Sequence, residues 1–366
     1  MNVRDVCAVI DVFAPPALAY EWDRAGLSIG RPDAEVTGVL VALTVTRPVF
    51  EAAREAGAEL IISHHPLLWE PFQALRTDDP MTRLCLDIAQ AGISCYAAHT
   101  CLDVAPGGVS ALLAARLGLT NVRPLFSAPQ AAQVKLVAFV PETHVVQVRD
   151  AVCRAGAGVI GDYTYCTFSA PGTGTFLPGE NTQPFSGEKH RVNEERELRF
   201  EVLTPKARLA GVLQALNAAH PYEEAAYDIV CLDNRDPTAG LGVRGELPGP
   251  VPLRRFADHV RAALDLSHVR MAGHGDKAVL RVAAIGGAGG REIMNLPGDV
   301  DVLLTGDIGY HEAHLAESRG VALVDAGHAG TEKCVVPALA DYLARTLSSV
   351  GVSSYVEPDV FTMITA

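Results

Sequence analysis

Residues 58–66 read AELIISHHP, an apolar run that ends abruptly in two histidines and a proline. Short runs of β-branched and other apolar residues are typical of strands that are buried on both faces of a sheet. Comparable runs lie at residues 36–46, 93–98, 279–285, 300–304 and 321–324. Helix-like stretches alternate with them, at residues 48–57, 80–92, 309–320 and 335–348. The alternation predicts an α/β outer domain with two lobes and mainly parallel sheets.

The middle of the chain, residues 128–234, follows another pattern. A strand-like run and a helix-like stretch are followed by a segment rich in glycine, proline and threonine, and then by a second helix and strand. This order is typical of an α+β ferredoxin-like unit. Turn-rich junctions at both ends indicate that the unit is inserted into a loop of the outer domain. We therefore predict an outer domain formed by residues 1–127 and 235–366, interrupted by the inserted domain.

The composition limits the classes of partner. The chain of 366 residues has a formal net charge of −13, which argues against binding of nucleic acid because that needs a basic surface. A bound metal would still allow an anionic substrate, since its charge dominates at short range. No apolar run approaches the ~18 residues of a membrane-spanning helix. The N-terminus does not resemble a signal peptide. We therefore expect a cytoplasmic protein without a membrane partner. The sequence has no CxxC pair, so we expect its cysteines to be free and mostly buried thiols.

The SHHP motif at residues 63–66 is the first candidate metal-binding motif. It directly follows a predicted strand, and the carboxyl ends of strands face the ligand crevice in open α/β sheets. Adjacent strand residues point to opposite faces, so His64 and His65 are expected to reach different metal ions. The alternative is a polar strand end with incidental histidines.

Two further motifs follow predicted strands in the same way. AHTCLD at residues 98–103 places a histidine near Asp103, although an aspartate here would also suit the N-terminal cap of a helix. DAGHAGTE at residues 325–332 places His328 and Glu332 four residues apart, on one face of a helix that begins there. Its alternative is a glycine-rich turn with a helix cap. The three motifs support one another, because each lies where an α/β sheet presents its crevice.

The predicted metal donors are His64, His65, Asp103, His328 and Glu332. Three imidazoles and two carboxylates exceed the three protein ligands of a typical catalytic zinc, so two divalent ions that share a carboxylate are expected. The mixed donor set admits zinc, iron or manganese. Two such ions activate water and stabilise both oxygens of a hydrolytic displacement. No catalytic side chain is therefore expected beyond metal-bound water.

These motifs, together with WDRAGLSIG at residues 22–30 and TGDIGYHEA at residues 305–313, resemble a known family. It is the family of hexameric dinuclear-metal proteins named after NGG-one-interacting factor three, also known as GTP cyclohydrolase 1 type 2 homologues. The resemblance implies that the five donors bind two metals and that the chain assembles into a ring-shaped homohexamer. Residues 156–176 and 220–230 resemble the family's middle domain, which has the fold of the signalling and copper-tolerance trimers. Three more side chains are expected beside the donors, as second-shell or substrate-contacting groups: His99, Asp325 and His311.

Two positions depart from the family pattern. Cys101 stands where the family has asparagine, so a thiol would alter the surroundings of the donors or invite oxidation. The GGAGG loop at residues 286–290 lacks the family's serine. Its backbone N–H groups at Gly286, Gly287 and Gly289 would cradle an anion. A tight structural turn is the alternative for this loop.

The donor set and the resemblance together predict a metal-dependent hydrolase that acts on a nucleotide-like substrate. The family name suggests opening of the purine ring of GTP. A non-catalytic protein for metal storage, metal delivery or regulation is the alternative, because family members are linked to transcription-factor partners. DNA handling fits the net charge of −13 poorly.

Overall fold

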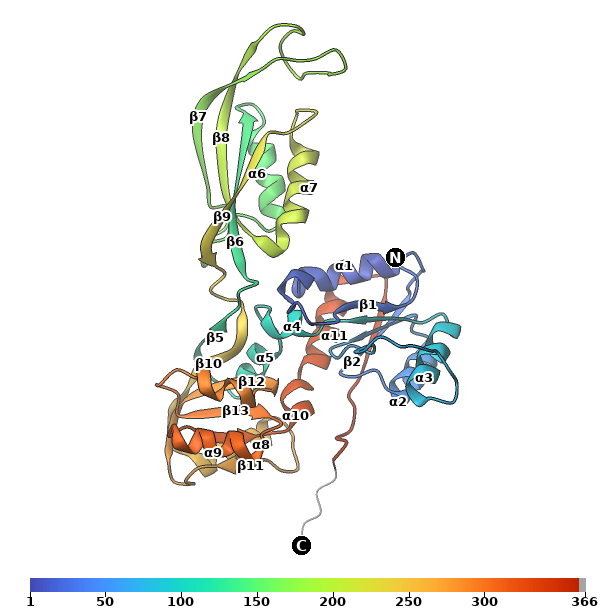
Figure 1. Cartoon of the computed structure of the whole chain (residues 1–366), viewed down its shortest axis with the longest axis vertical. Helices are drawn as coiled ribbons and strands as arrows, with labels where there is room; N and C mark the ends of the chain where they lie inside the picture. Colours follow the sequence, from blue (N-terminus) through green and yellow to red (C-terminus); the bar gives the residue numbers. More distant parts are fainter. Residues whose placement is uncertain (362–366) are drawn as a thin grey trace. The chain divides into compact units, whose positions relative to one another are not determined.

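The computed structural model describes residues 1–361, and the described chain forms two compact units (Figure 1). One unit contains Met1–Ala128 together with the chain from Pro237 onward, and the other contains Pro129–Asp236. Helices and strands alternate along most of the first unit, which confirms the predicted α/β class.

The first sheet of the larger unit has the strand order β1–β4–β3–β2–β15. Its strands are β1 (Gly26–Ile29), β4 (Ser94–Ala97), β3 (Leu60–Ser63), β2 (Gly38–Ala42) and β15 (Gly351–Tyr355). Only β1 is antiparallel to its neighbour; the other pairs are parallel. Because β3 and β4 are parallel and in register, with Ser63 opposite Ala97, the residues that follow these two strands emerge side by side.

Helices cover both faces of this sheet. Helices α2 (Arg47–Glu55) and α3 (Pro80–Gln90) contribute Phe50 and Ile88 to a core with Ile61 of β3. Helix α11 (Val335–Thr346) contacts β2 and β15, and α1 (Val3–Phe13) packs on α11. The start of α3 is encoded locally, since the Asp79 side chain accepts a hydrogen bond from the Thr82 N–H.

The second sheet has the order β11–β14–β13–β12–β10–β5. Its strands are β11 (Arg270–Ala272), β14 (Ala322–Asp325), β13 (Val302–Gly306), β12 (Ala278–Ala288), β10 (Gly240–Pro252) and β5 (Thr120–Ser127). Alternate residues of β13 enter two separate cores: Leu304 packs with α5 (Val109–Arg116) and α8 (Leu253–Ala263), and Leu303 packs with α9 (Tyr310–Ser318) and η3 (Gly290–Asn295). Helices α4 (Thr100–Val104) and α10 (His328–Glu332) and the 3-10 turn η1 (Pro16–Leu18) complete the unit.

The expectation of mainly parallel sheets is wrong for this second sheet. Only β12–β13 and β13–β14 are parallel, whereas β10 pairs in the antiparallel sense with both β12 and β5, and β11 with β14. The β5–β10 pair explains part of the difference, because Ser127 is opposite Gly240 and the smaller unit lies in the chain between them. When the chain leaves a sheet at the end of one strand and returns beside the same point, the two strands run in opposite directions and form an antiparallel pair.

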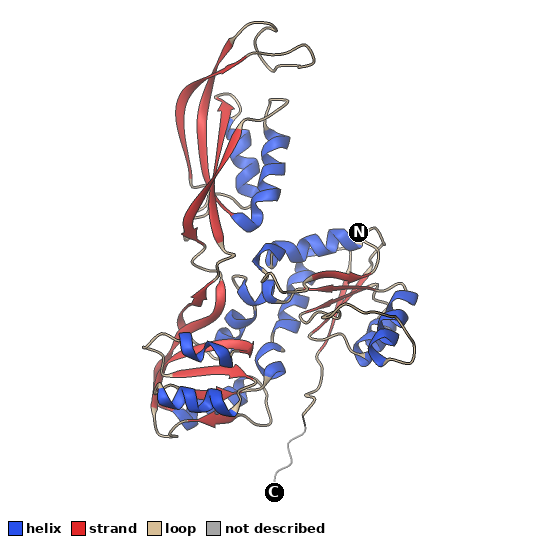
Figure 2. Cartoon of the chain, in the orientation of Figure 1, coloured by secondary structure: helices blue, strands red, loops and turns tan. Residues whose placement is uncertain are grey.

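The smaller unit has one antiparallel sheet with two helices (Figure 2). The strand order is β7–β8–β6–β9, formed by Thr167–Phe176, Asn193–Pro205, Ala132–Pro141 and Tyr227–Arg235. Helices α6 (Val145–Arg154) and α7 (Leu209–Ala219), the latter preceded by η2 (Lys206–Arg208), pack on one face around Phe200. The ferredoxin-like identity of this unit stays a prediction.

Two expectations about partners and thiols concern the whole chain. No helix in residues 1–361 has the length and apolar character that a membrane span requires. All eight cysteines are free thiols, and five of them are buried. Burial, with the Asp23 and Asp103 carboxylates nearby, raises the pKa of Cys101 to about 12, so this thiol is neutral and poorly reactive. The expected sensitivity of Cys101 to oxidation therefore has no support in its surroundings.

Candidate metal centre

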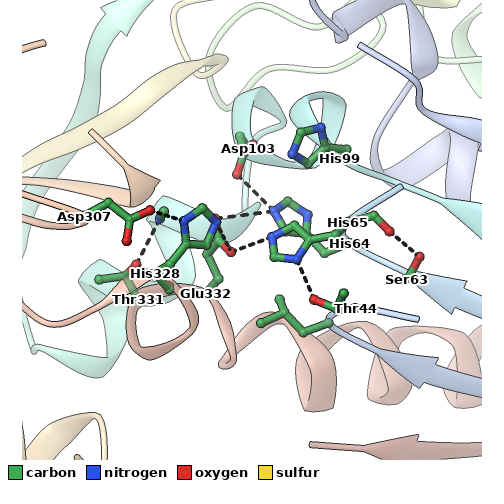
Figure 3. A network of polar contacts seen from close by, with 12 residues as sticks. Thr44, Ser63, His64, His65, His99, Asp103, Asp307, His328, Thr331 and Glu332 are labelled. Atoms are coloured by element: carbon green, nitrogen blue, oxygen red, sulfur yellow. Dashed lines mark hydrogen bonds and ion pairs between the residues drawn. The ribbon is translucent and has the colours of Figure 1, made fainter. Parts of the chain in front are cut away.

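Six side chains that could bind metal converge where three strands end (Figure 3). His64 and His65 directly follow β3, and His99 and Asp103 follow β4. His328 and Glu332 lie on α10, which follows β14 of the second sheet. The packing of two sheets therefore brings the tail of the chain to its first hundred residues, at the carboxyl ends of parallel strands.

Glu332 is the carboxylate around which the histidines gather. Its oxygens lie 3.0 Å from His65 Nε2, 3.3 Å from His328 Nε2 and 3.7 Å from His64 Nε2. Asp103 Oδ1 lies 3.6 Å from His64 Nε2. All five predicted donors are thus within one cluster, and the histidines present their Nε2 atoms to the two acids.

The donor atoms form two groups whose members all lie within 4.8 Å of one another. We call His64, His99 and Asp103 the local group, because its residues follow two neighbouring strands of one sheet, β3 and β4. We call His64, His65 and Glu332 the bridging group, because its residues come from both ends of the chain. His64 belongs to both groups, and His328 adjoins the bridging group through Glu332.

The structure includes His99 among the candidate donors, whereas the sequence placed it beside them. Its Nδ1 lies 2.8 Å from the buried Asp23 carboxylate, which leaves its Nε2 available to the local group. A proton on Nδ1 that is donated to a carboxylate is the usual arrangement of a metal-binding histidine.

The other three histidines are held in the same manner. The Nδ1 partners are the Ala98 carbonyl for His64 at 3.0 Å, Thr44 Oγ1 for His65 at 2.7 Å and Asp307 Oδ2 for His328 at 2.7 Å. Each partner fixes the orientation of the ring and directs Nε2 toward the acids. Hydrogen bonds within the protein therefore hold four histidines ready to bind a cation.

Two buried polar atoms of the local group lack a hydrogen-bond partner within residues 1–361: His64 Nε2 and Asp103 Oδ1. Leaving a buried polar atom unpaired costs about 1–3 kcal/mol, so such atoms are rare without a functional reason. A cation between a basic nitrogen and a carboxylate oxygen would satisfy both. The residues present thus fit a divalent ion.

The two acids have opposite pKa shifts. Burial raises the pKa of Asp103 to about 6, although the attraction of His64 opposes the shift. Burial would also raise the pKa of Glu332, but the imidazoles of His328, His64 and His65 around this carboxylate outweigh burial and hold the pKa well below the ordinary value. Glu332 is therefore the acid that is firmly ionised, and it is the one shared by most histidines.

The glycine loop packs directly against the donors. A Cβ atom added to Gly287 would lie 2.3 Å from Glu332 Oε1, and φ of this residue is +64°, so only glycine fits without strain. The Gly287 N–H donates to Thr331 Oγ1 at 2.9 Å, and the Gly289 N–H donates to Thr305 Oγ1 at 2.8 Å. The Gly286 N–H is directed at Ser110 Oγ at 3.4 Å. These hydrogen bonds favour a tight structural turn for the glycine loop, because they already occupy its N–H groups. They do not support the anion-binding role, which stays a prediction.

The other two predicted residues, Asp325 and His311, belong to neither group. Asp325 accepts hydrogen bonds from the N–H groups of Gly327 and Ile308 and contacts Arg270, so it holds the loops that carry His328 and Asp307. His311 is exposed on α9, where its ring contacts Tyr310.

Sequence reasoning missed Asp23, Thr44 and Asp307. Asp23 and Asp307 lie within the motifs WDRAGLSIG and TGDIGYHEA, so the motifs contained the residues but not their role. Asp307 also has a φ of +56°, which is uncommon outside glycine and is found at constrained functional positions. Nothing in the sequence around Thr44 indicates its contact with His65.

The fold and the donor cluster define an α/β protein with a candidate metal centre between two sheets. The family model Duf34/NIF3 (NGG1p interacting factor 3) matches residues 1–358. The chain belongs to this family, as the sequence resemblance predicts.

Relatives of known name and structure agree with this assignment. The GTP cyclohydrolase 1 type 2 homolog of Halalkalibacterium halodurans is 39% identical over 99% of both chains. The protein of the same name from Bacillus subtilis is 39% identical over 90% of this chain and 88% of its own. The crystal structure of a Bacillus cereus protein related to NIF3 is 38% identical, with a TM-score of 0.87 over 100% of this chain and 99% of that one. Staphylococcus aureus SA1388 has a TM-score of 0.73 at 29% identity, over 100% of this chain and 99% of that one.

Proposed function

We propose that this protein is a metal-dependent hydrolase of a nucleotide-like substrate, with two divalent ions held by His64, His65, Asp103, His328 and Glu332. The observation that carries the proposal is the pair of donor groups that share His64, with His64 Nε2 and Asp103 Oδ1 buried and unpartnered. Two divalent ions in such a centre would supply activated water and stabilise charge on the reacting oxygens. Zinc, iron and manganese all suit imidazole and carboxylate donors.

Different side chains would supply the charge and the orientation that metal binding requires. Asp103 and Glu332 supply the negative charge that offsets the cations, and Asp23, Thr44 and Asp307 keep the imidazoles oriented. His328 has the most exposed side chain among the candidate donors, at 40%, so substrate would approach from its side. GTP is the substrate to test first, because the relatives are named as GTP cyclohydrolase 1 type 2 homologs. We further propose a ring-shaped homohexamer in the cytoplasm.

Two measurements test this proposal. Elemental analysis of the purified full-length chain should find two divalent ions per subunit, and fewer in His64→Ala and Glu332→Ala variants. Release of formate from GTP by the metal-loaded protein tests the substrate. Inactivity toward GTP with two ions bound would reject that substrate and leave the metal centre in place.

A metal-delivery or regulatory protein is the second candidate. The partial exposure of the His65 and His328 side chains, 21% and 40%, favours it because exposed ligands permit release of an ion. Rapid transfer of isotopically labelled metal to a chelator, without turnover of nucleotides, would support this function over hydrolysis. Slow exchange together with nucleotide turnover would reject it.

A further inference from the structure

Three aromatic side chains lie beside His99, outside the donor set: Tyr20, Trp22 and Trp69. The rings of Tyr20 and Trp22 are stacked, with centroids 5.6 Å apart and planes 5° apart. The Trp69 ring is set across Trp22 at 62°, with centroids 5.9 Å apart. We call these three residues the aromatic corner.

The aromatic corner is connected to the candidate metal centre through His99. The Trp69 ring meets the His99 ring edge to face at 5.6 Å, and the His99 ring lies 5.2 Å from that of His64. A planar group that contacts Trp22 and Trp69 would therefore lie next to His99, which is one of the candidate donors.

The backbone around Trp22 is held against the start of α4. The Asp23 carboxylate accepts hydrogen bonds from the Thr100 N–H at 2.9 Å and from the Thr100 hydroxyl at 2.5 Å. The Tyr20 N–H donates to the same hydroxyl at 3.0 Å. Because Asp23 also holds His99, the position of the Trp22 ring and that of a candidate donor depend on one carboxylate.

Trp69 lies in the long connection between β3 and α3, residues 64–79. Connections of this length without a helix or strand are uncommon and are usually functional. Trp69 is 45% exposed, and Phe72 in the same connection is 39% exposed. Trp22 is 55% exposed. Indoles are buried in most folds, so two exposed indoles in mutual contact beside a polar cluster indicate a binding surface.

We propose that the aromatic corner binds the planar heteroaromatic ring of the substrate, a purine-like base, and places it beside the donors. This inference rests on the proposed function, since it names the part of the nucleotide that selects the site. Two indoles set across each other offer one ring face for stacking and one for an edge contact, which suits a flat ring better than an aliphatic or sugar group. Trp22 and Trp69 are thus the residues that determine specificity.

Trp22 and Trp69 are the only two tryptophans of the chain, so indole fluorescence reports on the aromatic corner alone. The zinc-loaded full-length protein is titrated with guanosine, with GTP and with ribose 5-phosphate, and indole emission is recorded. Guanosine and GTP should change the emission with saturation, whereas ribose 5-phosphate, which has no aromatic ring, should not. Equal responses to all three compounds would overturn the proposal.

Variants assign the effect to the corner. Trp22→Ala and Trp69→Ala should each raise the Kd for guanosine about tenfold, the expected loss from one base–aromatic stack. Trp22→Phe should retain most of the affinity. Phe168→Ala is the matched control, because Phe168 is also an exposed aromatic residue, 63%, and lies in the smaller unit. Each alanine variant keeps one indole as a fluorescence reporter. If one variant misfolds, the other variant still tests the proposal.

The outcomes separate this inference from the proposed function. Unchanged Kd values in both alanine variants would reject the corner, even if GTP is hydrolysed. Saturable guanosine binding that the variants weaken, without formate release from GTP, would support the corner and reject GTP turnover. Metal content is measured in every variant, and a normal value shows that the centre is intact. If the variants change only the subunit assembly in sedimentation, the corner is an interface between copies and the inference fails.

Discussion

The local group and the bridging group share His64 but depend on different parts of the fold. The donors of the local group follow β3 and β4, neighbouring parallel strands of one sheet, so strand register alone places them together. The bridging group needs Glu332, which follows β14 of the second sheet, so it forms only if the two sheets pack correctly. One half of the candidate centre therefore depends on the pairing of two strands, and the other half depends on the packing of the two sheets.

The two groups also differ in how their acids are satisfied. Glu332 is contacted by three histidines and has a pKa well below its ordinary value. Asp103 Oδ1 has no hydrogen-bond partner within the described residues, and burial raises the pKa of this acid to about 6. We therefore expect the bridging group to keep its geometry without a cation and the local group to gain more order when a cation binds.

The largest effect is expected from His64→Ala, because His64 belongs to both groups. Its Nε2 can bind only one ion, but it lies between both acids, so its loss should remove that ion and weaken the other, and the metal content should fall from two ions per subunit to one or none. Elemental analysis of the purified variant measures the change, and circular dichroism checks that the fold remains. A variant that still holds two ions would show that His64 binds neither of them.

Glu332→Gln and Asp103→Asn should have complementary effects of intermediate size. The first removes the charge of the bridging group and the second that of the local group, so each variant should lose one ion and retain the other. Each variant is the control for the other. Metal content by elemental analysis, with a spectroscopically visible ion such as cobalt(II), distinguishes the two positions. Identical spectra for the two variants would contradict the division into groups.

Gly287→Ala should weaken the bridging group without removing a donor. The new methyl group would lie 2.3 Å from Glu332 Oε1 at a residue with φ of +64°, so the carboxylate has to move. We expect the loss of one ion and a destabilisation of about 1 kcal/mol or more from the backbone strain. Gly298→Ala is the control, since an added Cβ there meets no atom within 4 Å. Chemical denaturation and metal titration measure both effects.

Asp23→Asn and Asp307→Asn should lower metal affinity about 10–100-fold, the usual effect of removing the partner of a metal-binding histidine. Asp23 supports His99 of the local group, and Asp307 supports His328 beside the bridging group. The two variants should therefore affect different ions in competition titrations with a chelator. Equal weakening of both ions by either variant would indicate that the groups are not independent.

Thr44→Val should give the smallest effect, because it removes one neutral hydroxyl that lies 2.7 Å from His65 Nδ1. A hydrogen bond of this kind contributes about 1 kcal/mol, so the affinity of the bridging group should fall only several-fold. The same chelator titration measures it. A loss as large as that of Glu332→Gln would mean that the orientation of His65, rather than the charge of Glu332, controls the bridging group.

Much of the fold was predictable because its signals are local. The apolar run before His64 and the run at residues 321–324 became strands β3 and β14, and the stretch beginning at Pro80 became helix α3. The antiparallel strands of the second sheet were not predictable. Strand β10 pairs with β5, and the smaller unit separates these two strands in the sequence. Strand direction depends on where a distant segment returns, and no local pattern records that.

The residue types that follow each strand, and with them the histidines and acids from which a metal centre could be built, can be read directly from the sequence. Which nitrogen of each histidine is free depends on the fold, because the hydrogen-bond partner of the other nitrogen comes from elsewhere in the chain. The partners of His99, His65 and His328 are Asp23, Thr44 and Asp307, which are 76, 21 and 21 residues away in the chain. The physical reason is that a hydrogen bond needs two atoms within about 3 Å, and that proximity is a property of packed sheets and loops rather than of spacing in a sequence.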